Sequence, residues 1–323
     1  MTTKDELLKL FEANKGIYYN GEQIAAKLGV SRNAIWKAVT ALREAGYPIE
    51  SQKNRGYCMS PDSDIVSAQG ISKYLTAELN IEVYDEVVST NTMLKERASS
   101  GAPEGLVIIA NSQTGGKGRL GRSFYSPLDT GVYISVLLRP STLPPQKALK
   151  ITTMAAVAAS EAVDIVSGKD SKIKWVNDIF LDGLKVAGIL TEASVSMENG
   201  NLEYAVLGIG FNVYAPKNGF PDEIKGIAGS ILRKPSADAK NRIAAEFLNR
   251  FYSFWKEGEG SDYYKEYKQR SLVIGKKVNV ISPNASAKAT VLDITDDCSL
   301  LVRYEDGTVS ELSTGEVSIR PEV

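Results

Sequence analysis

The spacing of apolar residues changes twice along this chain, and no single layer of secondary structure accommodates all three patterns. Up to Gly46 the apolar residues recur every three or four positions, which is the period of a helix packed on a core. From Ser67 to about Arg270, apolar strands alternate with helical stretches, and beyond Gly275 apolar residues alternate with polar ones, as in short strands. We therefore predict an α+β chain with domains at residues 1–63, 64–273 and 274–323.

The first domain has the pattern of a winged helix-turn-helix. Helices are predicted at residues 4–12 and 22–28, and the second of them ends at Gly29. A third helix begins directly afterwards at the N-cap Ser31. Two short strands about a Lys-Asn-Arg-Gly turn follow within residues 49–59 and would form the wing.

The third helix has one face that suits DNA. Ile35, Val39 and Leu42 share the opposite face and predict its buried side. Asn and Lys side chains offer donors to purine edges in the major groove, and cations on the wing can meet phosphates. The residues expected to contact DNA are Arg32, Asn33, Trp36, Lys37 and Thr40 on the helix and Lys53 and Arg55 on the wing. The alternatives are that such a domain docks to a protein or simply caps the rest of the chain.

The central domain is predicted to hold a mixed sheet. Because the apolar strands between residues 173 and 213 follow one another without helices, a regular alternation of parallel strands and helices is excluded. Residues 145–166 are apolar almost all round and predict a helix buried against the sheet. The last domain is expected to be a small, SH3-like β-barrel of about five strands, with a turn at Asp306-Gly307. The central strands are predicted at residues 81–88, 106–110, 132–138, 173–176, 186–191 and 204–209.

The absence of histidine limits the chemistry of the whole chain. Ser-His-Asp triads, Cys-His pairs and histidine-containing zinc sites are excluded, so catalysis would use Lys, Arg and carboxylates. Cys58 and Cys298 are too far apart in the sequence for a zinc motif or a C-x-x-C pair. With no signal-peptide pattern and no apolar run of the ~18 residues that a membrane span needs, we expect a cytoplasmic protein without membrane association.

Residues 113–124 (QTGGKGRLGRSF) place cations between glycines directly after an apolar strand. The glycines match the dinucleotide pattern G-x-G-x-x-G, but the Ser-Phe-Tyr-Ser-Pro segment that follows does not begin the helix that this pattern requires. The segment instead suits a mobile loop that wraps an anion with side chains and backbone amides, and a solvated surface loop is the alternative. The cations are Lys117, Arg119 and Arg122.

Polar residues also flank strongly apolar strands further along the chain. Lys185 begins the strand KVAGILTE, where it could neutralise a carboxylate or an α-phosphate, or extend into solvent from the strand end. Asn177 and Asp178 could hold ribose hydroxyls, phosphates or Mg²⁺. The glycines of residues 207–213 (LGIGFNV) indicate close approach of a ligand or a second backbone. Residues 89–91 (Ser-Thr-Asn) offer three hydrogen-bonding side chains, although this pattern also caps helices.

In this order, the segments STNT, QTGGKGRLGR, KWVND, KVAGILTE and GIGFN resemble the catalytic core of biotin protein ligases. With the winged domain in front, the chain resembles the bacterial ligases that also repress the biotin operon. The resemblance implies that MgATP activates biotin to biotinyl-5'-AMP with release of pyrophosphate. A lysine of the biotin carboxyl carrier protein of acetyl-CoA carboxylase, or of a similar carboxylase, would then accept the biotin.

A single winged domain carries few basic residues for specific DNA binding. Residues 1–60 contain nine Lys or Arg and six Asp or Glu, and the whole chain has a net charge of -1. Two such domains are therefore expected to bind a palindromic operator together, as a homodimer. We expect biotinyl-5'-AMP to be the corepressor that favours this dimer.

The resemblance also implies roles for individual residues. The residues that it assigns to biotin are Ser89, Thr90, Asn91, Gln113, Lys117, Gly118, Arg119, Lys185, Gly188 and Gly208. Those that it assigns to the nucleotide are Gly116, Arg122, Asn177, Asp178, Asn212 and Arg320. Lys185, Arg119 and Asp178 would act in catalysis, with Asp178 also the metal ligand. Such chemistry consists mainly of positioning and charge stabilisation and needs no histidine, because the biotin carboxylate is already ionised at neutral pH.

Three positions depart from the family pattern. Val176 stands where the family usually has proline, and Lys117 and Phe124 replace the more usual Arg and Trp. An arginine guanidinium can form two parallel hydrogen bonds to an anion, whereas the ammonium group of Lys117 acts as a single charge. The replacement is expected to alter the affinity for biotin or for the adenylate. A lipoate-type ligase with the same fold and a ligand-sensing transcription factor without catalysis remain as alternatives. The Ser-Thr-Asn segment favours biotin over lipoate, and the joint presence of three catalytic candidates argues against a pure sensor.

Overall fold

The computed structural model describes residues 2–198, 200–258, 261–282, 285–313 and 316–318. The chain divides into two compact units, of which the first comprises Met1–Thr76 and Lys234–Ala245. The second comprises Ala77–Arg233 and Glu246–Val323. Two segments expected in the central domain therefore lie with the first unit, and the C-terminal strands share a unit with the central sheet. The predicted boundaries after residues 63 and 273 stay a prediction.

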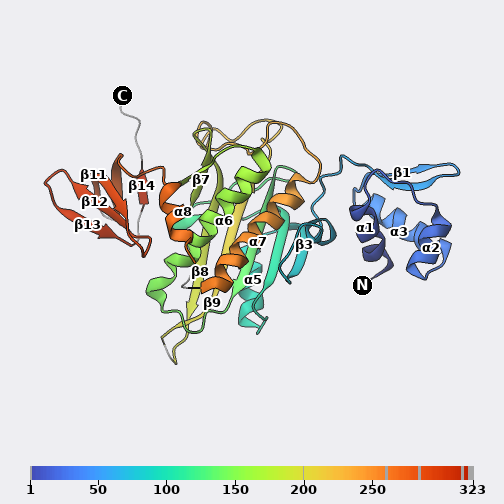
Figure 1. Cartoon of the computed structure of the whole chain (residues 1–323), viewed down its shortest axis with the longest axis horizontal. Coiled ribbons are helices and arrows are strands. Elements are labelled where there is room, and N and C mark those ends of the chain that lie inside the picture. The colour runs from blue at the N-terminus through green and yellow to red at the C-terminus, as the bar shows by residue number, and fades with distance from the viewer. Residues whose placement is uncertain (1, 199, 259–260, 283–284, 314–315, 319–323) are drawn as a thin grey trace. The chain divides into compact units, whose positions relative to one another are not determined.

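The first unit contains a winged helix-turn-helix (Figure 1). Its first three helices begin at side-chain caps, which are provided by Thr2, Asn20 and Ser31. These caps satisfy backbone N–H groups that have no partner within the helix. Apolar side chains of all three helices and of the hairpin meet in one core, so the predicted winged helix-turn-helix is confirmed. The elements are α1 (Thr3–Ala13), α2 (Gly21–Leu28), α3 (Arg32–Glu44), β1 (Ile49–Gln52), β2 (Gly56–Met59) and α4 (Ala68–Ser72).

Four charged side chains form a cluster inside the first unit. Lys73 Nζ lies 2.8 Å from both Glu12 Oε2 and Asp238 Oδ2, and Lys15 Nζ lies 2.7 Å from Asp238 Oδ1. The Glu12 side chain is fully buried, and its charge would be costly there without the two lysines. The cluster joins α1 and α4 to the residue that precedes α7 (Ala239–Glu257).

The second unit is built on a seven-stranded mixed sheet with the strand order β3-β4-β5-β9-β8-β7-β6. β3 and β4 pair in parallel, and the other neighbouring strands of this sheet pair antiparallel. The predicted mixed sheet is confirmed, although the strand expected at residues 173–176 ends at Lys174 and β7 was not predicted. β6 and β7 are too short to show an alternating pattern of apolar and polar residues. The strands are β3 (Asn80–Val87), β4 (Leu106–Gln113), β5 (Gly131–Leu138), β6 (Lys172–Lys174), β7 (Asp178–Leu181), β8 (Leu184–Val195) and β9 (Leu202–Asn212).

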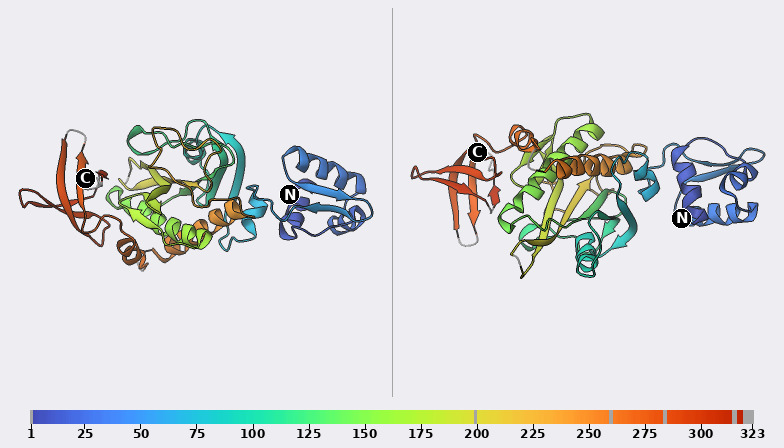
Figure 2. Two further views of the ribbon diagram at one scale, coloured as in Figure 1. Left: turned by 90° about the horizontal axis from the view of Figure 1, so that it is seen from above. Right: turned by 60° about the horizontal axis from the view of Figure 1, so that its bottom comes forward.

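Helices cover both faces of this sheet. Figures 1 and 2 show α6 (Leu149–Ser167) and α7 side by side on one face, where the ring of Phe211 from β9 meets Phe247 of α7 at a centroid distance of 5.7 Å. On the other face α5 (Thr90–Ser99) packs against β4, β5 and β9. α6 is buried almost all round, as predicted, and α8 (Tyr263–Gln269) packs beside it. Among the described residues, no helix is long and apolar enough to cross a membrane.

The C-terminal strands form an antiparallel sheet with the order β13-β12-β11-β10-β14. Trp175 Nε1 donates a hydrogen bond of 3.0 Å to the backbone carbonyl of Cys298, so this sheet is attached to the turn that follows β6. The five strands and their antiparallel pairing agree with the prediction. They are β10 (Lys277–Ser282), β11 (Ala285–Ile294), β12 (Leu300–Tyr304), β13 (Val309–Leu312) and β14 (Glu316–Ser318).

Candidate functional site

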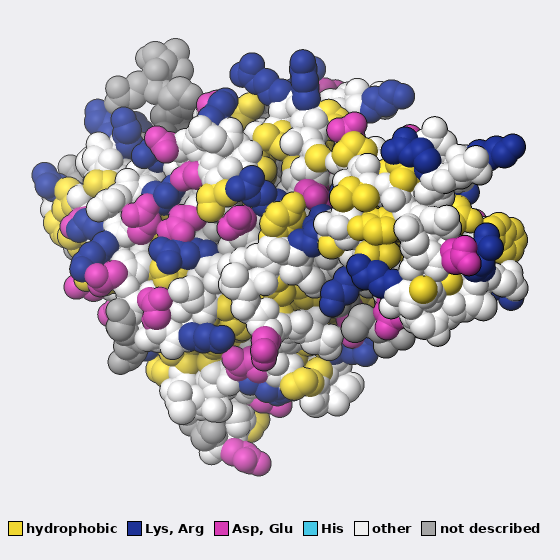
Figure 3. Space-filling view, turned by 45° about the vertical axis from the view of Figure 1, so that its right-hand side comes forward, with side chains coloured by type: hydrophobic (Ala, Val, Ile, Leu, Met, Phe, Trp, Pro, Cys, Tyr) yellow, Lys and Arg dark blue, Asp and Glu magenta, His cyan; other side chains and the backbone are white. Residues whose placement is uncertain are grey.

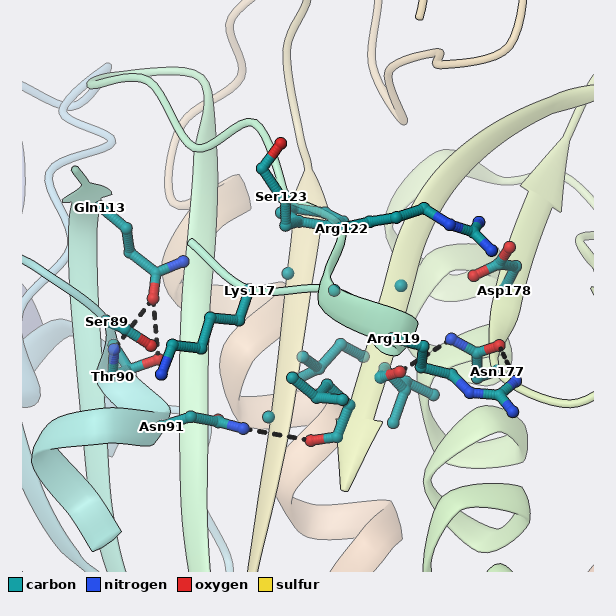
Figure 4. A pocket seen from close by; sticks show the side chains of 18 of the residues that line it. Ser89, Thr90, Asn91, Gln113, Lys117, Arg119, Arg122, Ser123, Asn177 and Asp178 are labelled. Carbon is teal, nitrogen blue, oxygen red and sulfur yellow. Dashed lines mark hydrogen bonds between the residues drawn. The ribbon is translucent and has the colours of Figure 1, made fainter. Parts of the chain in front are cut away.

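One pocket of the second unit gathers most of the side chains that the sequence predicted for biotin and the nucleotide (Figure 4). It lies over β8 and β9, between the start of α5 and the glycine-rich loop after β4. Residues from five separate segments of the chain thus meet in one place. The predicted residues that line it are Ser89, Thr90, Asn91, Gln113, Lys117, Gly118, Arg119, Arg122, Asn177, Asp178, Lys185, Gly188 and Gly208.

The Ser-Thr-Asn segment both caps a helix and lines the pocket. Ser89 is the N-cap of α5, and its hydroxyl accepts a hydrogen bond from the backbone N–H of Thr92. Thr90 and Asn91 are buried in the first turn of the same helix. The two interpretations of this segment are therefore compatible, because the cap fixes the turn that points these side chains at the pocket.

Gln113 at the end of β4 is held in one orientation. Its Oε1 accepts a hydrogen bond of 2.9 Å from the backbone N–H of Thr90, and its Nε2 donates one of 3.0 Å to Ser126 Oγ. The Ser126 hydroxyl in turn donates to the carbonyl of Phe124. Ser126 was not predicted from the sequence, where it is one of many serines.

A buried chain of polar side chains underlies the pocket. Ser135 Oγ lies 2.7 Å from Thr90 Oγ1 and 2.6 Å from Asn91 Oδ1, and Asn91 Nδ2 donates to Glu192 Oε2 at 2.9 Å. Lys95 Nζ lies 2.6 Å from Glu192 Oε1. Burial raises the pKa of the Glu192 carboxyl, but hydrogen bonds from Lys95 and Asn91 outweigh burial and hold that pKa below its usual value. The sequence prediction missed both Ser135 and Glu192.

A signal for Ser135 exists in the sequence. Every residue of β5 is buried, and Ser135 is a short polar side chain among mainly apolar neighbours. A buried polar side chain requires a hydrogen-bond partner, which would have indicated a polar environment beside this strand. Glu192 gives a weaker signal, since a carboxylate at the end of an apolar strand is usually solvated.

The glycines of β8 and β9 admit protein side chains. A Cβ atom on Gly208 would lie 2.1 Å from Asn91 Oδ1, and one on Gly210 would lie 2.4 Å from the ring of Phe124. A Cβ atom on Gly188 would lie 3.1 Å from both the Lys185 side chain and the Phe124 ring. Asn91, Phe124 and Lys185 thus lie beside these glycines, which also line the pocket, and close approach of a ligand to Gly188 and Gly208 stays a prediction.

The predicted catalytic cation is paired with the predicted metal ligand. Lys185 Nζ lies 2.6 Å from Asp178 Oδ1, across the hairpin that joins β7 and β8. Both side chains are about three-quarters buried, with 27% and 21% exposed. Arg119 donates to Asn177 Oδ1 at 3.1 Å, and Asn177 Nδ2 donates to the carbonyl of Ile189. These contacts bring the cation of the loop and the cation of the strand to one side of the pocket.

The glycine-rich loop folds as a tight turn. Gly118 N–H donates to the carbonyl of Arg122 at 2.7 Å, and Phe124 N–H donates to the carbonyl of Gly116 at 2.9 Å. Its tip, Leu120, is 74% exposed with a φ angle of +55°. Only one 3-10 turn lies within the loop, with no α-helix after it, so the geometry required of a dinucleotide fingerprint is absent from these described residues. Figure 4 shows Lys117 extending from this loop into the pocket.

Two predicted nucleotide residues, Gly116 and Asn212, lie outside the lining of this pocket. A Cβ atom on Gly116 would lie 2.4 Å from the carbonyl of Phe124, so this glycine serves the folding of the loop. Asn212 pairs with Gly131 at the end of β9, and its carbonyl accepts a hydrogen bond from Ile231 N–H. Arg320 lies outside the described residues. The described residues contain no group of three or more acidic or sulfur side chains that could hold a metal ion.

The predicted DNA-contacting residues of α3 share an exposed face. Arg32, Asn33, Trp36 and Lys37 are exposed, and Thr40 is half-buried with its hydroxyl donating to the carbonyl of Trp36. On the wing, the guanidinium carbon of Arg55 lies 4.1 Å from the centroid of the Tyr18 ring. In the face of the molecule that Figure 3 shows, Lys and Arg are interspersed with Asp and Glu, in keeping with the net charge of -1 of the whole chain.

Three family models match successive parts of the chain. An HTH domain matches residues 3–58, the biotin/lipoate A/B protein ligase family matches residues 84–212, and the biotin protein ligase C terminal domain matches residues 273–320. The bifunctional ligase/repressor BirA of Bacillus subtilis (strain 168) is 32% identical over 314 residues, which cover 95% of each chain. This chain belongs to the bifunctional biotin ligase/repressor family. Its similarity to the BirA protein of Escherichia coli (strain K12) is lower, at 25% identity over 94% of each chain.

Solved structures of biotin protein ligases share the fold of about three-quarters of this chain. The biotin protein ligase of Aquifex aeolicus in complex with biotin and ATP is 25% identical, with a TM-score of 0.62, and the match covers 75% of this chain and 98% of that one. A mutant form of the same protein in complex with biotin is 26% identical, with a TM-score of 0.61 and the same coverage of both chains. These two matches agree with the family to which the chain belongs.

Proposed function

We propose that this chain is an ATP-dependent biotin protein ligase that also acts as a biotin-responsive repressor of the biotin operon. The observation that carries the proposal is the pocket over β8 and β9, where hydrogen-bonding side chains and cations gather beside each other. Cations at one end suit a carboxylate and phosphates, and polar side chains at the other suit a ring with hydrogen-bonding groups. The names of the relatives support the same activity.

In the first step, the carboxylate of biotin attacks the α-phosphorus of ATP. An O–P bond forms, the bond to the β-phosphate breaks, and pyrophosphate leaves with biotinyl-5'-AMP as the other product. Both reactants are anions, so the step depends on positive charge held in place before they meet. Lys185 and Arg119 would supply this charge, and Asp178, which is paired with Lys185, would keep the ammonium group in position.

In the second step, a neutral lysine amine of a carrier protein attacks the acyl carbon of the mixed anhydride. A C–N bond forms, AMP leaves, and the amine loses a proton. The acceptor is a biotin carboxyl carrier protein of acetyl-CoA carboxylase or of a similar carboxylase. The glycine-rich loop would keep the adenylate away from water until this acceptor arrives, because Lys117, Arg119 and Arg122 converge on the same pocket.

Mg²⁺ would enter with the phosphates of ATP. Asp178 is a carboxylate at the pocket wall, and a cation that retains several waters and phosphate oxygens needs only one or two such ligands. Asn177 and Asp178 would serve the nucleotide, with Gly116, Asn212 and Arg320 as further nucleotide residues. The ion would neutralise phosphate charge during adenylation.

The winged domain would bind operator DNA through the exposed face of α3 and through Lys53 and Arg55 of the wing. A homodimer would place two such domains on a palindrome. The outer part of β8 supports dimerisation, because the described strands leave its side opposite β9 unpaired beyond Ile189. Biotinyl-5'-AMP would be the corepressor, and the cytoplasm would be the compartment.

One incubation separates the proposal from its alternatives. The chain is incubated with ATP and Mg²⁺ and either biotin or lipoate, and pyrophosphate release is measured. Release with biotin and none with lipoate is expected. Release with lipoate alone would indicate a lipoate-type ligase, and release with neither would indicate a sensor without catalysis.

A further inference from the structure

We infer that Glu192 is a positioning residue that orients the hydrogen-bonding groups of the pocket so that they accept a ligand N–H group. The inference rests on the proposed function and concerns how the pocket selects biotin. The ureido ring of biotin carries N–H donors, whereas the dithiolane ring of lipoate has none. Glu192 itself would act through two other side chains, Asn91 and Ser135.

The orientation of the Asn91 amide follows from its contact with Glu192. A carboxylate only accepts hydrogen bonds, so the amide atom that lies 2.9 Å from Glu192 Oε2 must be Nδ2. The same nitrogen also donates to the carbonyl of Leu190 at 3.3 Å. The amide oxygen of Asn91 therefore faces Ser135, at 2.6 Å. Asn91 is only 4% exposed, so water offers no competing partner.

The Asn91 oxygen then determines which way the hydroxyl protons point. An amide oxygen only accepts, so the single proton of Ser135 goes to Asn91 Oδ1. Ser135 is fully buried, and the hydroxyl of Thr90 lies 2.7 Å from its oxygen. Thr90 Oγ1 could donate its one proton to Ser135 Oγ at 2.7 Å or to Gln113 Oε1 at 3.2 Å. Since Ser135 has no second proton, its shorter contact with Thr90 requires the Thr90 proton, and Thr90 then does not donate to Gln113.

The outcome is a pair of acceptors at the pocket wall. Thr90 Oγ1 has given its proton away from the pocket, and Gln113 Oε1, which lies 3.2 Å from it, is fixed by the hydrogen bond from Thr90 N–H. Two oxygens at this distance repel one another mildly until a donor lies between them. A ligand N–H group satisfies both oxygens, whereas a ring without a donor leaves them unpaired.

The variant Glu192→Gln tests this chain of orientations. In that variant Lys95, which faces the Oε1 side of residue 192 at 2.6 Å, would attract the amide oxygen and turn the amide nitrogen toward Asn91. Two donors would then meet, so the Asn91 amide would rotate and the protons of Ser135 and Thr90 would reverse. We expect biotin to bind about 10- to 100-fold more weakly in calorimetric titrations with biotin alone. In the adenylation assay, KM for biotin should rise with little change in kcat.

Two further variants separate orientation from a structural role of the Lys95–Glu192 ion pair. Lys95→Met removes the ion pair but keeps the carboxylate acceptor, so biotin affinity should stay within about threefold of wild type. In Lys95→Met/Glu192→Gln, the glutamine can turn its oxygen back to Asn91, so most of the affinity lost in Glu192→Gln should return.

Three results would overturn the inference: biotin affinity unchanged in Glu192→Gln, Lys95→Met weakening biotin as much as Glu192→Gln does, or a double variant no better than Glu192→Gln. The proposed function is judged separately. If the wild-type chain releases no pyrophosphate with biotin and ATP, the proposed catalysis is wrong, but biotin titrations without ATP still measure the effect of residue 192.

Discussion

The ammonium group of Lys185 and the carboxylate of Asp178 lie 2.6 Å apart across the hairpin between β7 and β8. The pairing holds the ammonium group close to Gly188, in the wall of the pocket. A lysine fixed in this way loses less freedom when an anion binds than a lysine extended into solvent would. Lys185, which is expected to assist adenylation most, is thus already held in position before a substrate binds.

Lys185→Ala should slow formation of biotinyl-5'-AMP roughly 10- to 100-fold, because a charge-assisted contact contributes about 1.5–3 kcal/mol. Pyrophosphate release under single-turnover conditions measures this rate. Lys169→Ala is the matched control, since Lys169 forms an exposed ion pair with Asp182 at the other end of the same hairpin. A Lys185→Ala rate equal to wild type would show that this lysine does not assist adenylation.

Arg119→Gly should allow adenylation but release biotinyl-5'-AMP into solution. The substitution removes the hydrogen bond from Arg119 to Asn177 and one of the loop cations that would retain the adenylate. Chromatography of the small-molecule fraction, in the absence of acceptor protein, measures the free intermediate. If wild type and variant release equal amounts, retention of the adenylate does not depend on this arginine.

Substitutions on the exposed face of α3 should weaken DNA binding and leave ligation unchanged. Asn33→Ala is expected to cost about 1–3 kcal/mol for one operator base pair, whereas Lys53→Ala should weaken binding to every sequence and reduce the salt slope by about one unit. Titrations of operator and unrelated DNA at several salt concentrations distinguish the two effects. Loss of biotinylation in either variant would contradict the separation of roles.

Asp238→Asn should destabilise the first unit by about 3 kcal/mol, because it leaves Lys15 and Lys73 with one carboxylate fewer in a partly buried cluster. Hydrogen exchange of α1 amides in the full chain reports on this unit alone. Asp262→Asn, which removes the partner of the exposed Lys265, should leave this exchange unchanged. Equal exchange in wild type and Asp238→Asn would contradict a stabilising cluster.

The same cluster predicts a pH dependence. Burial raises the pKa of the Asp238 carboxyl, but hydrogen bonds from Lys15 and Lys73 lower this pKa below 3.8 overall. The ionised carboxylate therefore stabilises the folded unit at pH values above 3.8, and this stabilisation is lost as the pH falls through the lower folded-state pKa. Burial lowers the pKa of Lys73, but its bonds to Asp238 and Glu12 raise it above 10.5 overall. The lysine contribution is therefore lost only as the pH rises through that higher value. Protection of α1 from exchange should fall in acid in wild type, and less so in Asp238→Asn.

Biotin and ATP together should convert the chain from monomer to dimer. The edge of β8 that the described strands leave unpaired beyond Ile189 would offer backbone hydrogen-bonding groups to a second copy, and ordering of the pocket beside it would favour that contact. Sedimentation at micromolar concentration, with and without both ligands, measures the change in mass. A monomeric mass with both ligands bound, together with tight operator binding, would contradict the proposed dimer.

The sequence alone was sufficient for features that depend on neighbouring residues. The cap at Ser31, the helix end at Gly29 and the helical spacing of apolar residues predicted the winged domain, because a helix end satisfies its N–H groups from side chains within three residues. The order of polar and glycine-rich segments likewise indicated the residues that line the pocket. The resemblance to biotin protein ligases indicated the reaction, which the spacing of residues could not indicate by itself.

Only the tertiary structure decided which distant residues are partners. Asn91 and Glu192 are 101 positions apart, and Lys15 and Asp238 are 223 apart, so no local pattern indicates either pair. The registers of β5 with β9 and of β8 with β9 bring Ser135 and Leu190 opposite Gly208, where Asn91 fills the space that a side chain would need. Because these polar side chains are buried, they must form hydrogen bonds with one another. These hydrogen bonds determine which groups at the pocket wall donate and which accept.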